Sequence, residues 1–355
     1  MSISDLGEFG LIRRLRQRLS RHFAPPHVLV GPGDDSAILS PPSPGHSLVF
    51  TTDAMVEDVH FRLAWSSPSD LGWKLVAINV SDIAAMAARP LFATISIALR
   101  EKIDLSWFDA FIDGIDEAAS EYQLRPVGGD IVRSTGPLFL CLSAVGEVDP
   151  SKMLLRSGAK PGHLLMVTGH LGASGAGLRG LEKGLALSAR PARACPGREA
   201  EARGPNPDLI PAIQAHLRPR PRLAAAQALG GLASAGLDIS DGLAGDAMRL
   251  AEESGVAVRL EIERLPIAPA CLKAAEKLDF DPIEMALRGG EDYELLFSVE
   301  PGRVQEVQRA LAQSATPAAV IGSIHEGEPS VIASWPDGRE EKISGGYDHF
   351  AATEK

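Results

Sequence analysis

Hydrophobic residues recur along this chain with two different spacings, and each spacing predicts a type of regular element. Near the start, apolar residues every three or four positions alternate with arginines, which predicts an amphipathic helix over residues 5–22. The same spacing predicts a helix capped by Ser69 or Asp70 that runs to about residue 88 and is stopped by Pro90, and another over residues 106–122. Short apolar runs bounded by turn residues predict strands, at residues 28–30, 48–53, 92–99 and 138–148. Strands and helices in this order are typical of an α/β fold.

The pattern is interrupted at residues 149–162 by prolines and glycines, and we place a domain boundary between residues 149 and 150. Beyond it, strands are expected at residues 163–168, 256–262, 293–299 and 318–325, and helices at about residues 219–233, 242–254 and 301–313. We therefore expect an α/β domain over residues 1–149 and a second one over residues 150–355. Residues 186–208 lack hydrophobic periodicity and are rich in Ala, Arg and Pro, which predicts a mobile surface insertion.

Composition narrows the possible functions. The 355 residues are 45% hydrophobic and 23% charged, which is typical of a globular protein. With 35 Lys and Arg against 46 Asp and Glu, the formal net charge is −11, and the absence of a dense basic run argues against nucleic acid as a partner. The longest apolar runs are far short of the roughly 20 residues of a membrane span. No secretory signal is expected, the three cysteines indicate neither disulfides nor zinc, and a cytoplasmic location follows as the expectation.

The candidate chemistry lies in aspartates that follow or precede small residues, five times in one chain. We expect these groups at strand ends: Gly33-Asp34-Asp35, Thr51-Thr52-Asp53, Ser81-Asp82, Gly129-Asp130 and Asp238-Ile239-Ser240-Asp241-Gly242. Mg²⁺ prefers oxygen ligands and is usually held by one or two carboxylates together with substrate phosphates. A single such Asp is more often a turn residue or a helix N-cap, and an N-cap before the expected helix at 242–254 is the equally good alternative for Asp241. All five together favour a magnesium-binding protein that handles phosphates.

Other phosphate-binding arrangements are absent or ambiguous. No Gly-Lys dipeptide occurs, so a Walker A loop is excluded. The glycine-rich stretch Gly169–Gly177 is compatible either with phosphate contact by backbone N–H groups or with a tight turn from strand to helix. Acidic metal ligands without a P-loop lysine favour phosphoryl transfer in which metal ions neutralise the charge.

At these residues the chain resembles the thiamine-monophosphate kinase family, which belongs to the aminoimidazole-ribotide-synthetase-like superfamily. The resemblance is carried by motifs distributed over most of the chain. They are Gly7-Glu-Phe, Gly33-Asp-Asp-Ser-Ala, Thr51-Thr-Asp-Ala-Met-Val-Glu-Asp-Val-His-Phe, Asn79-Val-Ser-Asp-Ile-Ala-Ala-Met, Gly128-Gly-Asp, Arg156-Ser-Gly-Ala-Lys-Pro-Gly, Asp238-Ile-Ser-Asp-Gly-Leu, Gly289-Gly-Glu-Asp-Tyr-Glu-Leu and Gly346-Tyr-Asp-His-Phe. The resemblance implies a two-domain α/β (α+β) fold with an N-terminal mixed-sheet dimerisation domain and a C-terminal α/β domain. It also implies a homodimer that uses ATP and several Mg²⁺ ions to convert thiamine monophosphate to thiamine diphosphate.

Residue roles follow from the resemblance, motif by motif. The implied metal ligands are Asp34, Asp35, Thr51, Thr52, Asp53, Asp82, Asp130, Asp238 and Asp241. The implied ATP contacts are Gly129, Asp130, Arg156 and Ser240, and the implied substrate contacts are His60, Glu291 and Tyr347. No residue is expected to act as a nucleophile or base. On chemistry alone Asp292 is as good a substrate contact as Glu291.

Two alternatives remain open at this stage. The first is another ATP-dependent enzyme of the superfamily that acts on a different acceptor. The branches that use a reactive cysteine near the N-terminus or at the C-terminus fit poorly, because no Cys precedes Cys141 and the chain ends Ala-Ala-Thr-Glu-Lys. The second is a nucleotide-binding dimer without catalytic activity.

Overall fold

The computed structural model describes residues 11, 14, 15, 17–23, 28–30, 38–39, 43–185 and 206–346, and these form two compact units. Described residues up to Ile83, together with Ala88–Pro150, belong to the first unit. Residues 84–87, 151–185 and 206–346 belong to the second. Asp34, Asp35 and Tyr347, and residues 186–205 of the expected insertion, lie outside the described residues.

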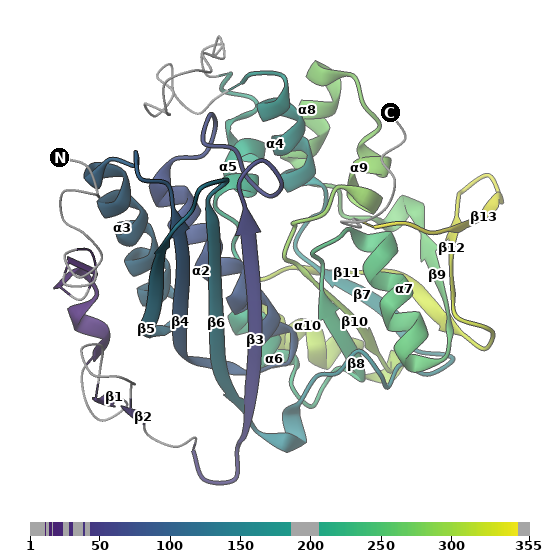
Figure 1. The fold of residues 1–355 in the computed structure, drawn as a ribbon. Helices are drawn as coiled ribbons and strands as arrows, with labels where there is room; N and C mark the ends of the chain where they lie inside the picture. Colours follow the sequence, from purple (N-terminus) through teal and green to yellow (C-terminus); the bar gives the residue numbers. More distant parts are fainter. Residues whose placement is uncertain are drawn as a thin grey trace. The chain divides into compact units, whose positions relative to one another are not determined.

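A four-stranded mixed sheet forms the centre of the first unit, with the order β3-β6-β4-β5 (Figure 1). Its strands are β3 (Ser47–Val56), β4 (Arg89–Leu99), β5 (Arg125–Arg133) and β6 (Phe139–Val148). β4 and β5 are parallel, whereas β6 pairs antiparallel with both β3 and β4. The expected mixed sheet in the N-terminal part is therefore confirmed.

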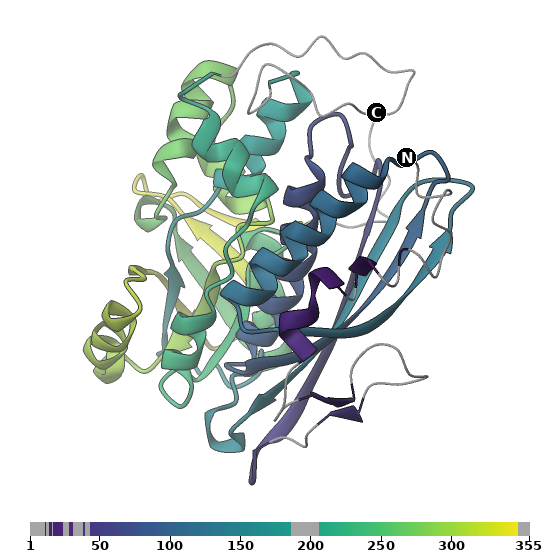
Figure 2. The same ribbon diagram turned by 90° about the vertical axis from the view of Figure 1, so that its left-hand side faces the viewer.

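Helices α2 (Pro68–Ala85) and α3 (Leu105–Glu121) cover one face of this sheet (Figure 2). Side chains alternate between the two faces of a strand, so Ile95 and Ile97 of β4 point toward the helices and are buried, while Ser96 between them is exposed. The helix-facing side also receives fully buried aromatic residues of α3, Phe108 and Phe111. This layer is the core of the first unit.

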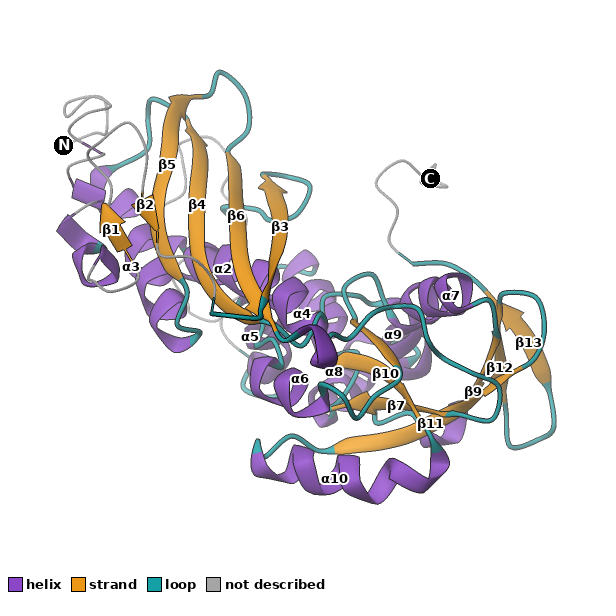
Figure 3. Ribbon diagram, turned by 90° about the horizontal axis from the view of Figure 1, so that it is seen from below, coloured by secondary structure: helices purple, strands orange, loops and turns teal. Residues whose placement is uncertain are grey.

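The opposite face of the sheet carries exposed apolar side chains. In the described part of the first unit α2 and α3 both lie on the other side of the row of strands (Figure 3). Phe50 is 70% exposed and Leu48 60% exposed on β3, and Val132 and Phe139 add to the same face from β5 and β6. We call these four residues the open-face cluster.

The arginines near the start of the chain pair with α3. Residues 11, 14, 15, 17 and 18 are helical, and a 3₁₀ turn follows at Ser20–Phe23. Arg14, Arg18 and Arg21 form ion pairs with Asp109, Asp113 and Asp116, respectively. Residues at these spacings share one face of a helix, so the row of arginines lies opposite the row of aspartates on α3. A short antiparallel pair, β1 (Val28–Val30) and β2 (Ile38–Leu39), follows.

The second unit contains a seven-stranded sheet in the order β13-β12-β9-β11-β7-β10-β8, parallel only between β9 and β12. Its strands are β7 (Leu164–Thr168), β8 (Ala235–Asp238), β9 (Ala257–Glu261), β10 (Leu295–Val299), β11 (Ala318–His325), β12 (Ser330–Ser334) and β13 (Glu340–Ile343). Its α-helices are α4 (Ala173–Glu182), α5 (Ile210–Leu217), α6 (Leu223–Leu229), α7 (Leu243–Ser254), α8 (Pro269–Leu278), α9 (Pro282–Arg288) and α10 (Val304–Gln313). Single 3₁₀ turns lie at Pro150–Lys152, Ile262–Arg264 and Pro301–Arg303.

Helices pack on both faces of the second sheet. Leu165 and Val167 of β7 belong to a buried cluster with residues of α7, such as Leu250. Met166, between them, belongs to a separate cluster with residues of α6 and α10, such as Val307. Figure 3 shows α7 and α10 on opposite sides of the strands. The expected α/β architecture of the C-terminal part is confirmed.

Two expected element boundaries are wrong. Helix α2 ends at Ala85, before the position where Pro90 was expected to stop it. Pro90 instead lies in β4, where a register shift in the pairing with β6 accommodates it. The helix expected at 219–233 begins only at Leu223, because Pro219 and Pro221 keep the preceding segment extended.

Among the helices that the structure describes, none combines the length and apolar composition needed to cross a lipid bilayer.

Candidate functional site

The first unit brings Thr51, Asp53 and Asp82 together where β3 packs on α2. Thr51 Oγ1 donates a hydrogen bond to Asp82 Oδ2 at 2.5 Å. The N–H of Asp53 donates to Asn79 Oδ1 at 3.1 Å, and Asn79 is fully buried. Thr51 and Asp53 occupy alternate positions of β3 and therefore share the face toward α2, as expected. For these two aspartates the expectation of strand ends is wrong, because Asp53 lies within β3 and Asp82 within α2.

This group suits a magnesium ion that is only partly held by protein. Within the described chain, no three His, Cys, Asp or Glu side chains are arranged to hold a metal ion. Asp53 and Asp82 are both half-buried and supply two carboxylates beside the Thr51 hydroxyl. Mg²⁺ keeps several waters and takes substrate phosphate oxygens as ligands, so two carboxylates are a sufficient protein contribution. The Thr52 hydroxyl points to the other face, where it donates to Leu142 O at 3.2 Å.

Gly129 and Asp130 lie within β5, and not at a strand end. The pairing register places Gly129 in one row with Ile95, Leu142 and Asp53. Three strand spacings separate the ends of this row, a distance of about 14 Å. Asp130 lies in the next row and therefore on the open face, where it is exposed. The structure does not bring Asp130 to Asp53 and Asp82.

His60 follows β3 in a turn and is half-buried. Its Nδ1 accepts the N–H of Val56 at 3.0 Å. A neutral imidazole carries one proton, so in this ring the proton is on Nε2. Nε2–H is then the hydrogen-bond donor of this ring.

The second unit brings Asp238, Ser240 and Asp241 together between β8 and α7. Asp238 is the last residue of β8 and is buried. The N–H groups of Ser240 and Asp241 both donate to Asp246 Oδ2, at 3.1 and 3.2 Å. Arg249 forms ion pairs with both Asp241 and Asp246. The N-cap of α7 is Gly242, so the expectation that Asp241 is a metal ligand or an N-cap loses the second alternative.

Asp246 is a residue that sequence reasoning missed. Its side chain is only 1% exposed. Burial, reinforced by the charge of Asp238, raises the pKa of Asp246 to about 7, against the lowering effect of Arg249. The pattern of aspartates beside small residues did not include it, because Asp246 lies in the first turn of a helix, four residues after Gly242. Its spacing after a helix start was the available signal.

Glu291 lies next to the Ser240 loop. Its N–H donates to Ser240 O at 2.7 Å, and its backbone is left-handed, with φ 56°. Its carboxylate oxygen Oε2 is 3.0 Å from His216 Nδ1. The structure thus brings together an implied substrate contact and an implied ATP contact.

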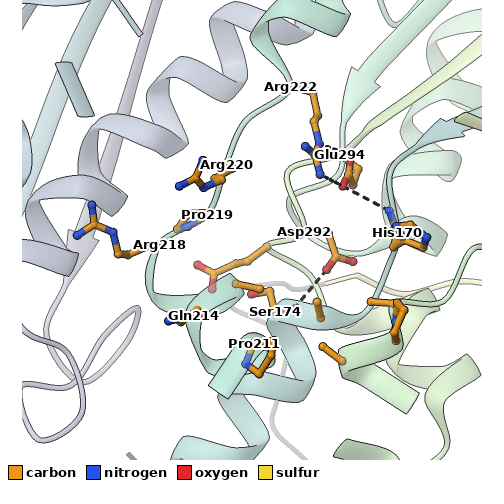
Figure 4. Close-up of a pocket in the computed structure, with 16 residues that line it drawn as sticks. His170, Ser174, Pro211, Gln214, Arg218, Pro219, Arg220, Arg222, Asp292 and Glu294 are labelled. Atoms are coloured by element: carbon orange, nitrogen blue, oxygen red, sulfur yellow. Dashed lines mark hydrogen bonds and ion pairs between the residues drawn. The ribbon is translucent and has the colours of Figure 1, made fainter. Parts of the chain in front are cut away.

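Glu291 lines a cavity of about 500 Å³ in the second unit. Figure 4 shows this cavity, with Asp292 and Glu294 among its labelled lining residues. Carboxylates of Asp292 and Glu294 and arginines of the segment before α6 share this cavity with small and apolar residues. The arginines are Arg218, Arg220 and Arg222. Arg222 forms a two-pronged hydrogen bond with Glu294, through Nε at 2.7 Å and Nη2 at 2.6 Å. Sequence reasoning missed this Arg-Pro-Arg-Pro-Arg segment, whose prolines fix an extended backbone that spaces the arginines evenly.

The glycine-rich stretch before α4 forms a tight turn from strand to helix. Gly172 N donates to Asp292 Oδ2 at 2.7 Å, and Ser174 N donates to Asp292 Oδ1 at 3.4 Å. Removal from bulk water, together with the Glu294 charge, raises the pKa of Asp292 to about 7, although these N–H groups lower it. Because a carboxylate of the chain already accepts from them, the structure favours the turn over phosphate contact.

Arg156 follows the 3₁₀ turn at Pro150–Lys152 and is exposed. Its carbonyl oxygen accepts from Ser254 Oγ at 3.0 Å, which fixes the backbone beside the end of α7. The guanidinium is thereby presented on the surface of the second unit. A planar fork of donors in that position suits phosphate oxygens.

Comparison with known proteins identifies relatives over nearly the whole chain. Residues 33–148 match the AIR synthase related protein N-terminal domain, and residues 160–333 match the C-terminal domain of the same family. The thiamine-monophosphate kinase of Salmonella typhimurium is 37% identical over 350 residues, which cover 97% of this chain and 98% of that protein.

Solved structures agree with these sequence relatives. Thiamine-monophosphate kinase from Stenotrophomonas maltophilia K279a is 34% identical, with a TM-score of 0.79, over 94% of this chain and 98% of that one. AaThiL complexed with AMPPCP and TMP is 33% identical, with a TM-score of 0.73, over 99% of both chains. Hydrogenase maturation protein HypE in complex with ATP, at 20% identity and a TM-score of 0.71, shares the fold alone. The chain belongs to the thiamine-monophosphate kinase family of AIR synthase related proteins.

Proposed function

We propose that the protein transfers the γ-phosphoryl group of ATP to thiamine monophosphate and releases thiamine diphosphate and ADP. The observation that carries this proposal is the similarity to AaThiL complexed with AMPPCP and TMP, at 33% identity over 99% of both chains. AMPPCP stands in for ATP, and its methylene bridge replaces the β–γ oxygen. The many curated thiamine-monophosphate kinases at similar identity support the same activity.

The transfer is direct and in line, and it depends on positioning and charge neutralisation. The acceptor phosphate is already an anion near neutral pH, so no strong base is required. Bound Mg²⁺ ions supply the positive charge that two phosphate groups need in order to approach each other. Asp53 and Asp82 with Thr51 hold magnesium in the first unit, and Asp238 and Asp241 hold it in the second. The carboxylates of Asp34, Asp35 and Asp130 and an oxygen of Thr52 would complete the set that the family resemblance implies.

Binding contacts come from both parts of the chain. ATP is contacted by Gly129, Asp130, Arg156 and Ser240. Because Asp130 lies on the open face, it serves a different ion or phosphate oxygen from that held by Asp53 and Asp82. Thiamine monophosphate is contacted by the Nε2–H of His60 and by Glu291 and Tyr347.

Residues 1–149 thus form the domain for ATP and magnesium binding and for dimerisation, and residues 150–355 form the second domain. The open-face cluster supports a homodimer, because apolar side chains exposed together on one sheet face are typical of an interface. The substrate ATP is a cytoplasmic metabolite, which favours a cytoplasmic enzyme.

A chromatographic assay tests the proposal. Purified protein is incubated with ATP and Mg²⁺ and with either thiamine monophosphate or thiamine, and ADP and thiamine diphosphate are followed together. We expect both products in equal amounts from the monophosphate alone. ATP turnover that ignores thiamine monophosphate would indicate another acceptor, as in other AIR synthase related enzymes, and binding of ATP without any turnover would indicate a non-catalytic protein.

Asp241→Asn is the informative variant for this assay. We expect it to lose turnover at saturating Mg²⁺, because it removes one carboxylate charge from the Asp238 and Asp241 pair. Asp337→Asn is the matched control, since Asp337 lies in an exposed turn of the second unit and accepts only a local N–H, from Arg339. Wild-type turnover in Asp241→Asn would overturn the role of that carboxylate.

A further inference from the structure

Glu291 is held in an unusual backbone conformation. Its φ of 56° lies in the left-handed region, which residues with a β-carbon rarely adopt. The hydrogen bond from its N–H to Ser240 O, at 2.7 Å, fixes this conformation. Left-handed residues other than glycine persist where the surrounding structure imposes them, and they concentrate at functional sites. The backbone conformation therefore sets the direction of the Cα–Cβ bond of Glu291.

A buried histidine contacts the carboxylate at the end of that side chain. Glu291 Oε2 lies 3.0 Å from His216 Nδ1, and Ser174 Oγ lies 3.1 Å from the same nitrogen. Because a carboxylate only accepts hydrogen bonds, an attractive contact with Glu291 at this distance requires a proton on Nδ1. The His216 side chain is 5% exposed, whereas that of Glu291 is 29% exposed.

Only one of the two side chains, that of Glu291, lines the cavity. His216 does not line it, although its neighbours Gln214, Ala215 and Arg218 do. His216 thus stands behind Glu291 on α5, and Ser174 on α4 supports its ring. A ligand in the cavity meets the carboxylate and does not meet the imidazole.

We propose that His216 is a positioning residue that, supported by Ser174, holds the Glu291 carboxylate in the orientation that contacts the organic substrate. This inference rests on the proposed function, because that function assigns Glu291 to thiamine monophosphate. Without the Nδ1–H donor, Glu291 keeps its charge and its backbone position but loses the contact that orients its carboxylate from the side of α5. Substrate binding then loses a preorganised partner, whereas the binding of ATP does not involve this side chain.

The kinetic test compares His216→Asn with His216→Gln. The Asn amide nitrogen reaches the position of Nδ1, whereas the Gln amide reaches that of Nε2, away from Glu291. We expect His216→Gln to raise the KM for thiamine monophosphate about tenfold, with kcat and the KM for ATP changed less than about threefold. His216→Asn should recover most of this loss. Equal KM values for the two variants, or equal rises for both substrates, would overturn the positioning role.

A double variant and a matched control complete the kinetic test. In a Glu291→Gln background, His216→Gln should raise the KM for thiamine monophosphate no further, because the interaction that it removes is already weakened. Additive effects would contradict the proposal. His163→Gln is the control, because His163 is similarly buried in the same unit and does not line the cavity. It should leave the KM for thiamine monophosphate unchanged.

A spectroscopic measurement examines the contact without substrate. In ¹⁵N-labelled protein, we expect the His216 ring, assigned with His216→Asn, to show a protonated Nδ1 whose shift changes in Glu291→Gln. Ring signals that Glu291→Gln leaves unmoved would overturn the contact itself. A wild-type protein that makes no thiamine diphosphate would instead overturn the proposed function, and with it the substrate assigned to Glu291, while the ring signals still decide the contact.

Discussion

Asp82 lies on helix α2, and its carboxylate accepts a hydrogen bond from the hydroxyl of Thr51 on the neighbouring strand β3. Asp82→Asn keeps an oxygen acceptor for this hydrogen bond but removes the charge that a magnesium ion needs. We expect kcat at saturating ATP to fall at least about 100-fold, with little change in the melting temperature. Steady-state kinetics over a Mg²⁺ titration and thermal unfolding measure the two effects.

Asp104→Asn is the matched control for Asp82→Asn. Asp104 precedes α3 in the same unit, and its side chain makes no capping hydrogen bond. This variant should retain wild-type turnover. A kcat for Asp82→Asn within about threefold of wild type would show that its carboxylate holds no essential ion.

Asp246 links the stability of the second unit to pH. Its pKa is raised from 3.8 to about 7 by burial, so between these values the folded protein binds a proton that the unfolded chain releases. The stabilisation of the protonated form is complete below about pH 4 and is lost as the pH rises through about 7. Relative to Asp246→Asn, the unfolding free energy of wild type should fall by up to about 1.4 kcal/mol per pH unit in this window. Urea denaturation of both proteins at several pH values measures these free energies. A wild-type unfolding free energy that stays constant or rises with pH relative to that of Asp246→Asn would contradict the assignment.

At the residue scale the sequence pointed to some members of the site but not to the residues that support them. Thr51 and Asp53 were expected on one face because strand periodicity determines it, and the structure confirms this. Asp246, Arg249 and His216 were missed. Their roles depend on which side chains the fold brings to about 3 Å from one another across different elements or turns. Residue type and spacing alone do not determine that, although a helix start was a signal for Asp246.

Gly129 shows how an element constrains a motif. A β-carbon at Gly129 would lie 1.9 Å from the carbonyl oxygen of Ile95 in the neighbouring strand β4. Gly129→Ala therefore forces β5 away from β4, and we expect a loss of at least about 2 kcal/mol of unfolding free energy. Gly128→Ala is the control, because its β-carbon meets only Thr94 Cγ2, at 3.8 Å. Chemical denaturation compares the two, and equal stability would show that the strands separate without cost.

Elements with strong local signals were predicted from the sequence, whereas both helices and strands without such signals were missed. The helix expected at 242–254 is α7 (Leu243–Ser254), because its apolar spacing and the glycines at both ends are local signals. β5 was missed because Gly128 and Gly129, in its middle, are typical of turns. α8 and α9 were also missed. Each begins with a proline, Pro269 or Pro282, which is a helix-start signal, but each is too short to show a clear repeat of apolar residues.

At the scale of the whole molecule, alternation of elements was sufficient to predict the α/β class, and the structure confirms it. Strand order was not predictable. In the second sheet β7 lies between β11 and β10, so strands more than 120 residues apart in the chain become neighbours. Such pairings depend on packing between segments far apart in the chain. Hydrophobic periodicity is read within windows of up to about 18 residues and carries no information on them.

The open-face cluster leads to a prediction about assembly. Phe50 is 70% exposed on a sheet face whose other side is already packed by helices, and in the proposed homodimer we expect a second copy of the chain to cover it. Phe50→Asp places a charge in that interface, and we expect it to weaken the dimer at least about 100-fold. Light scattering across a concentration series measures the mass of both proteins. Val59→Asp, at a residue that is 54% exposed in the turn after β3, should remain dimeric. A monomeric wild type, or a Phe50→Asp variant as dimeric as wild type, would assign the cluster to another role.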